Sequence, residues 1–224
     1  SAGGAGAEAA YVHALVGDLE LARGRVAPAR DAYREALRSL PDFPAGLAGL
    51  AQVDAASGEL QSAAARLRRA SDLLPLTTTL TLLSEVELAF GRREAAAGDL
   101  AAARAQHATL AASGTRPDAE AVLFEADHGS PARAVALGRR VWRAAPSIRS
   151  ADALGWALVR AGRPRAGSAW AQRALTTGSR DPAFNLHAGV AAARAGRPAL
   201  AERRLAVARR GRAALSPALA RRLP

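Results

Sequence analysis

Residues 24–58 have the sequence GRVAPARDAYREALRSLPDFPAGLAGLAQVDAASG, which begins and ends on a glycine. Glycine readily takes the left-handed conformation that ends a helix, and proline cannot continue a helical hydrogen-bond ladder. Pro28 follows Gly24 by four residues, where the first turn of a helix needs no amide hydrogen, and Pro41 ends the next alanine-rich stretch. The stretch therefore predicts a helix between the two prolines and a second helix that ends at Gly58.

This spacing recurs along the chain. Six glycines are separated by 34, 33, 38, 33 and 34 residues: Gly24, Gly58, Gly91, Gly129, Gly162 and Gly196. Small residues follow them, five residues later Ala29, Ala63, Ala96, Ala134, Gly167 and Ala201, and twelve residues later Ala36, Ala70, Ala103, Val141, Ala174 and Ala208. Such a period predicts helix pairs that bury small side chains against neighbouring pairs. We expect six repeats, at 10–43, 44–76, 77–114, 115–147, 148–181 and 182–214.

The ends and one interval depart from the repeat. Residues 1–9 are small and rich in glycine, so we expect a flexible lead-in, and we expect a capping helix at 215–224. Because there is no polar first helix before Tyr11, we expect further repeats to precede it in the natural protein, which the sequence does not establish. Four extra residues between Gly91 and Gly129 predict a loop or a longer helix end around 112–118.

Composition favours an all-α fold. Half of the 224 residues are apolar but only 4% are aromatic, and alanine supplies much of the apolar content. Sheets favour β-branched and aromatic residues, whereas stacked helices accept small ones. No stretch approaches the roughly 20 apolar residues of a membrane helix. We expect a soluble protein, cytoplasmic or exported, and the sequence does not distinguish these compartments.

The repeat resembles the tetratricopeptide repeat (TPR), whose 34-residue unit places a leucine and a small residue on its first helix and alanines on its second. The corresponding first-helix pairs here are Val16 with Gly17, Leu50 with Ala51, Leu83 with Ser84, Leu154 with Gly155, and Ala188 with Gly189. The fourth repeat matches least, with Ala121 and Val122 at these positions. Segments such as 123–129 and 156–162 are similar to a TPR subfamily of high-GC bacteria. The resemblance implies a right-handed superhelical solenoid with the first helices on its concave face.

The resemblance also implies a non-enzymatic scaffold that binds a peptide or partner protein in the concave groove. The predicted groove residues are Tyr11, Ala14, Asp18, Leu21, Gln52, Thr78, Thr81, Glu85, Leu88, Arg116, Leu123, Arg149, Asp152, Trp156, Val159, Leu186 and Val190. Trp156 either anchors a peptide side chain or fills the seam with the next repeat. The lysines and asparagines of the family's carboxylate clamp are missing, which argues against a chaperone-tail adaptor of that kind.

Charge gives an alternative function. From Arg139 onward there are 18 arginines against three acidic residues, a net of +15, whereas residues 1–138 have a net of −4. Such a basic end can attract nucleic acid, an acidic protein segment or an anionic membrane surface, or it can be a solvated face. The candidates on predicted second helices are Arg139, Arg140, Arg203, Arg204, Arg209 and Arg210.

Catalytic chemistry has little support. The chain has no cysteine and no lysine, which excludes thiol nucleophiles, thiolate metal sites, Schiff bases and a Walker lysine. Glu125, Asp127 and His128 are the best candidates for an acid–base or metal site, but a histidine at a helix end also serves as a cap. His187 is interpreted as a packing residue between repeats. We expect no cofactor.

Overall fold

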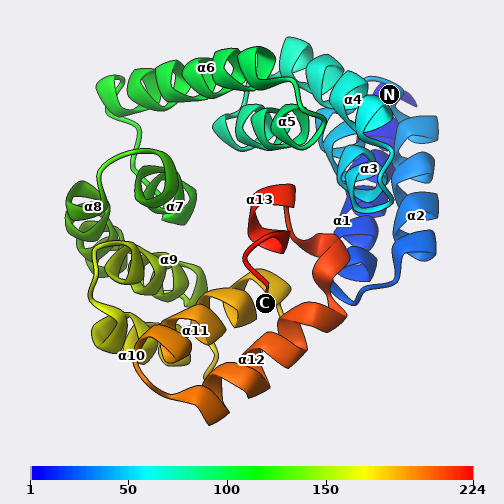
Figure 1. Ribbon diagram of the computed structural model, residues 1–224. Helices are drawn as coiled ribbons and strands as arrows, with labels where there is room; N and C mark the ends of the chain where they lie inside the picture. Colours follow the sequence, from blue (N-terminus) through cyan, green and yellow to red (C-terminus); the bar gives the residue numbers. More distant parts are fainter. Residues whose placement is uncertain (1, 224) are drawn as a thin grey trace. The chain divides into compact units, whose positions relative to one another are not determined.

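A computed structural model describes residues 2–223, with side chains from residue 5 onward. Over that range the regular structure is entirely helical, without a strand, which confirms the predicted all-α class. The helices form two compact units. The N-terminal unit comprises the chain up to Thr109 together with residues 211–222, and the C-terminal unit comprises residues 110–210. Figure 1 labels the helices of both units.

Three consecutive helix pairs and a short returning segment make up the N-terminal unit. The pairs are α1 (Ala2–Ala22) with α2 (Val26–Ser39), α3 (Pro44–Ala56) with α4 (Leu60–Leu73), and α5 (Thr77–Ala89) with α6 (Arg93–Ala112). The returning segment contains a 3-10 turn, η1 (Arg212–Ala214), and α13 (Pro217–Ala220). It packs against α1, α3 and α5, the first helices of the three pairs.

The C-terminal unit continues the same alternation. Its pairs are α7 (Ala119–His128) with α8 (Pro131–Ala144), α9 (Ile148–Arg160) with α10 (Pro164–Ala174), and α11 (Pro182–Arg194) with α12 (Pro198–Arg210). The first helices touch directly, because α9 packs against both α7 and α11. As a result α9 is buried on every side from Ser150 to Val159.

The small residues at fixed distances after the glycines form the seams. Each glycine is followed by one such residue at a spacing of five and another at a spacing of twelve, and all of these residues are buried. Pro131, Pro164 and Pro198 are the first residues of α8, α10 and α12, as predicted, because their missing amide hydrogen is not needed there. Burial of alanine and glycine lets helix axes approach closely, so the spacing of small residues in the sequence matches the spacing of close contacts between helices.

The turn glycines follow the prediction with one exception. Five of the six have a positive φ, between 73° and 88°. Gly129 instead has φ −123°, which any residue can adopt, so a left-handed helix end there was the wrong expectation. Its role is close approach: the Glu125 carboxylate accepts the Ser130 amide at 2.9 Å, and a methyl group on Gly129 would overlap that carboxylate.

Both predicted flanks need correction. Residues 2–9, expected to be a flexible lead-in, belong to α1. That helix is anchored by the buried Ala10, Ala14 and Leu21, and it continues through residues 2–9 although glycine has a low helix propensity. The segment expected to be a capping helix at 215–224 is helical only over Pro217–Ala220, and that helix packs on α5 of the N-terminal unit.

The extra residues between Gly91 and Gly129 are divided between a longer helix and a loop. Helix α6 runs for 20 residues to Ala112, and only Ala96 and Ala103 on it are buried. Residues 113–118 form the loop, and the Asp118 carboxylate then accepts the Ala121 amide at 2.9 Å to begin α7. The first helix of the fourth repeat therefore starts at Ala119, after the predicted repeat boundary at 115. The first helices α3, α5, α9 and α11 start at their predicted boundaries: Pro44, Thr77, Ile148 and Pro182.

Candidate functional site

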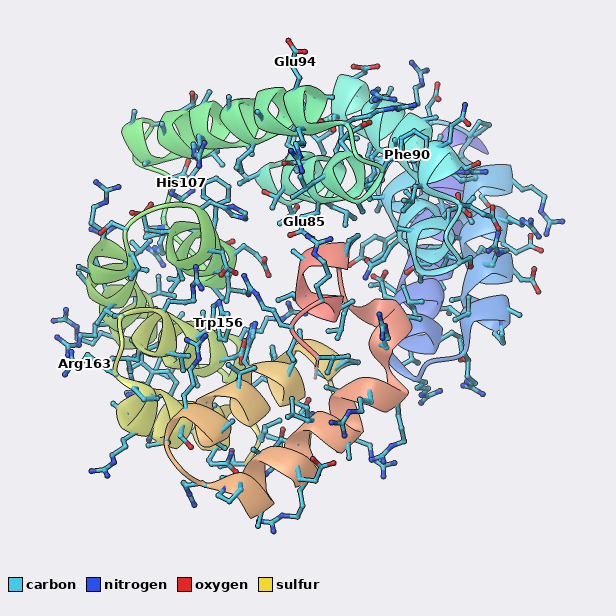
Figure 2. All side chains as sticks on the ribbon, viewed as in Figure 1. Glu85, Phe90, Glu94, His107, Trp156 and Arg163 are labelled. Atoms are coloured by element: carbon cyan, nitrogen blue, oxygen red, sulfur yellow. The ribbon has the colours of Figure 1, made fainter. Side chains whose placement is uncertain are left out.

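The surface of α1, α3 and α5 that holds residues 211–222 is the best candidate site, and we call it the N-terminal first-helix face. Two of its side chains bind main-chain atoms of the segment. Gln52 Nε2 donates to the Ala214 carbonyl at 2.6 Å, and a Glu85 carboxylate oxygen accepts the Ala218 amide at 3.0 Å. Figure 2 shows Glu85 between α5 and α13. Both side chains were predicted groove residues.

Apolar contacts complete this face. Ala213 and Ala214 pack against the core cluster that includes Ala14, Leu21 and Leu50. The next residue of the segment, Leu215, is only 4% exposed. The apolar contacts of Ala213 and Ala214 and the two main-chain hydrogen bonds therefore hold the segment on this face.

Glu85 is electrostatically unusual. Burial raises the pKa of its carboxyl above the ordinary glutamate value. Hydrogen bonds from Ser216 and Ala218 and the nearby charges of Arg221 and Arg222 oppose that rise. The carboxylate is therefore partly desolvated and faces donors and cations that all come from the C-terminal segment.

Two further predicted groove residues lie on α1. Tyr11 is 58% exposed. Asp18 accepts the Tyr33 hydroxyl at 2.7 Å, so this carboxylate links α1 to α2. Burial raises the pKa of Asp18, with the tyrosine hydrogen bond opposing the rise. Tyr11 is available for a ligand, whereas Asp18 has a structural partner.

The structure corrects the predicted groove residues of the C-terminal unit. Trp156 is 2% exposed, stacks on His187 with ring centroids 4.4 Å apart, and donates its Nε1 hydrogen to Asp127 at 3.2 Å. Asp152 is also buried, with its carboxylate 2.9 Å from His187 Nδ1. These side chains therefore fill the seam between repeats, and the interpretation of His187 as a packing residue is confirmed.

The remaining groove candidates are dispersed. Arg116 lies in the loop before α7, and Arg149 is exposed on α9, 3.9 Å from Glu120. Leu123 and Val190 are partly buried against the C-terminal core, Val159 belongs to that core, and Leu186 is fully buried. Within the C-terminal unit, the first helices thus present little apolar surface to a ligand.

One repeat position separates the two units. Six residues before each turn glycine stand Asp18, Gln52 and Glu85 in the N-terminal unit, and Leu123, Trp156 and Val190 in the C-terminal unit. The last three belong to or pack against one core cluster. Comparing this position between repeats would have separated a polar surface from a closed seam in the sequence itself.

A second position was missed. The last two repeats have Leu158 and Ala192 four residues before the turn glycine. The first four repeats have a carboxylate at that position: Glu20, Asp54, Glu87 and Glu125. Asp54 is 1% exposed and pairs with Arg30 and Arg66, and Glu87 is fully buried between Arg68 and Arg92. These carboxylates tie helix pairs together.

The acid–base candidates have structural contacts. Glu125 pairs with Arg133 at 2.7 Å, Asp127 lies 3.3 Å from Arg160, and the His128 ring lies 5.2 Å from that of Phe124. Among the side chains that the structure describes, no group of three or more histidine, aspartate or glutamate residues is arranged to hold a metal ion. Over the same residues, no helix is both long and apolar enough to cross a membrane.

The basic candidates lie on second helices, as predicted. Arg139 and Arg140 are exposed on α8, and Arg203, Arg209 and Arg210 are exposed on α12. Arg204 is partly buried and donates to Gln172 at 2.9 Å. Figure 1 shows α8 and α12 apart within the C-terminal unit.

Comparison with solved structures then tests the repeat architecture. A thermophilic TPR protein of Thermus thermophilus is 22% identical, covering 82% of this chain and 98% of that chain, with a TM-score of 0.57. The fold is TPR-like. A chain of the APC/C hetero-tetramer Cut9–Hcn1 aligns with a TM-score of 0.51 at 16% identity, covering 97% of this chain, which spans 43% of that one. No family model and no curated protein matches the sequence. At these identities the TPR likeness extends to the fold alone.

Proposed function

We propose that this TPR-like protein is a non-enzymatic scaffold that binds a peptide segment of a partner protein on the N-terminal first-helix face. One observation carries the proposal: Gln52 and Glu85, on two different first helices, hold main-chain atoms of a segment made of two short helical turns. Side chains that pair with main-chain groups recognise extended or turned peptides without demanding one sequence. Tyr11, which is exposed on α1, offers an aromatic side chain on one of the same three first helices.

The test is affinity capture of partners from the source organism's lysate by the full chain. We expect one or more proteins to bind the native chain and to be lost from the Gln52→Ala/Glu85→Ala variant. The matched control is Arg139→Glu/Arg140→Glu, which reverses two exposed charges on the second helix α8 and should keep the same partners. Loss of partners from the α8 variant alone would reject the first-helix face as the binding surface.

A further inference from the structure

The C-terminal segment has the properties of a docked ligand. Helix α13 has four residues, far fewer than an isolated helix needs to persist in water. Its N-terminus is capped by Ser216, whose hydroxyl accepts the Leu219 amide at 3.4 Å, and Pro217 occupies its first position. The conformation of the segment therefore depends on the face that it contacts.

Charge complements these contacts. Residues 211–222 contain Arg212, Arg221 and Arg222 and no acidic residue, a net of +3. Residues 1–109 contain 11 arginines and 13 acidic residues, a net of −2. The arginine charges at 221 and 222 act on the Glu85 carboxylate, so attraction is directed to the position that also holds the Ala218 amide.

Each part of the segment gives one requirement for a ligand. Leu215 supplies the buried apolar side chain, Ser216 and Pro217 start the turn that aims the Ala218 amide at Glu85, and two arginines follow. Gln52 binds only a carbonyl, which every residue has. Specificity therefore resides in the leucine, the Ser-Pro turn and the basic pair.

We propose that residues 211–222 are an intramolecular ligand that masks the N-terminal first-helix face. The partner that displaces them is a basic peptide of the same pattern, an apolar residue directly before Ser-Pro or Thr-Pro and an arginine pair four residues after the proline. Masking weakens binding of a partner, because the apparent affinity of the face equals its intrinsic affinity multiplied by the fraction of molecules in which the segment is released. This inference rests on the proposed function and adds its ligand class and its regulation.

The test uses a fluorescein-labelled peptide with the sequence of residues 211–222, GRAALSPALARR, titrated with the full chain by fluorescence anisotropy. The native chain should bind it weakly because its own segment occupies the face. The Leu215→Asp chain cannot bury that side chain, so its segment is released, and it should bind the peptide at least tenfold more tightly. A labelled peptide that carries Leu215→Asp should bind neither chain.

Two variants keep this test decisive. Arg221→Glu/Arg222→Glu releases the segment without touching a buried residue, so it replaces Leu215→Asp if that change unfolds the N-terminal unit, as judged by circular dichroism. Adding Glu85→Ala to either releasing variant should weaken peptide binding at least tenfold. Equal peptide affinity for the native and both releasing chains would overturn the masking, as would binding that is indifferent to Glu85→Ala.

Sedimentation velocity distinguishes docking of the segment on the face of its own molecule from docking on the face of a second molecule. We expect the native chain to sediment as the same species over a hundredfold concentration range. A concentration-dependent dimer that Leu215→Asp abolishes would show docking between copies and overturn intramolecular masking. If Gln52→Ala/Glu85→Ala loses its partner while the peptide affinities do not differ, the proposed function stands and only the masking fails.

Discussion

The two units are built from the same helix pair, but their first helices make different contacts. In the N-terminal unit the first helices present Gln52 and Glu85 to a separate segment of chain, whereas in the C-terminal unit α7, α9 and α11 close on one another around Trp156. The backbone repeat is common to both, so the difference resides in side chains at one position of the repeat. Polar residues there contact residues 211–222 of the same chain, and large apolar residues there pack into the core of the C-terminal unit.

The largest expected effect comes from opening the closed seam. Trp156→Ala removes a buried ring, its stacking on His187 and its hydrogen bond to Asp127, and should destabilise the C-terminal unit by roughly 3–5 kcal/mol. Urea denaturation followed by circular dichroism measures this. Trp142→Ala, at a partly buried ring on α8, is the matched control and should cost less. Equal losses would show that Trp156 does not close the seam.

A smaller loss is expected from overfilling the seam of the N-terminal unit. A methyl group at Gly49 would overlap the ring of the buried Tyr33, so Gly49→Ala should cost roughly 1–3 kcal/mol. Gly98 on α6 has no atom within 4 Å of an added methyl group, and Gly98→Ala should instead stabilise its helix by about 0.5–1 kcal/mol. Thermal unfolding of both variants gives the comparison, and a neutral Gly49→Ala would contradict the tight approach.

The polar position of the N-terminal unit should show a pH dependence. Because the pKa of Glu85 is raised on folding, its carboxyl favours the folded state at low pH, and this contribution is lost as the pH rises through the raised pKa. Glu85→Gln should therefore be more stable than the native chain at pH 7, by a margin that shrinks as the pH falls toward 4. A margin that grows on acidification would mean that the ionised carboxylate stabilises the fold.

The smallest effect is expected from the exposed arginines. Arg139→Glu/Arg140→Glu should change the free energy of unfolding by no more than about 0.5 kcal/mol, because both side chains are solvated. A gel-shift titration of the native chain with a short DNA duplex over a salt series should show no shift. A shift that weakens with salt and is lost in the variant would favour the anionic-ligand alternative.

The sequence predicted the helix pairs because glycine, proline and alanine act locally, through backbone conformation and close packing. It placed Gln52 and Glu85 correctly on first helices but could not show which part of the chain they contact, since the contact with residues 214 and 218 is made across more than 130 residues of sequence. Trp156 was assigned to the groove because the sequence of one repeat does not show whether the adjacent repeats cover this side chain. Comparison among repeats carries that information.

Helices α6 and α9 differ in how many of their residues are buried, and this difference predicts where the chain opens first. Of the 20 residues in α6 only two are buried, whereas ten of the 13 in α9 are. A helix with so few anchors opens locally at a small cost in free energy. Trypsin added to the native protein should cut first at Arg104, and amide deuterium uptake should saturate along α6 well before it becomes measurable in the middle of α9.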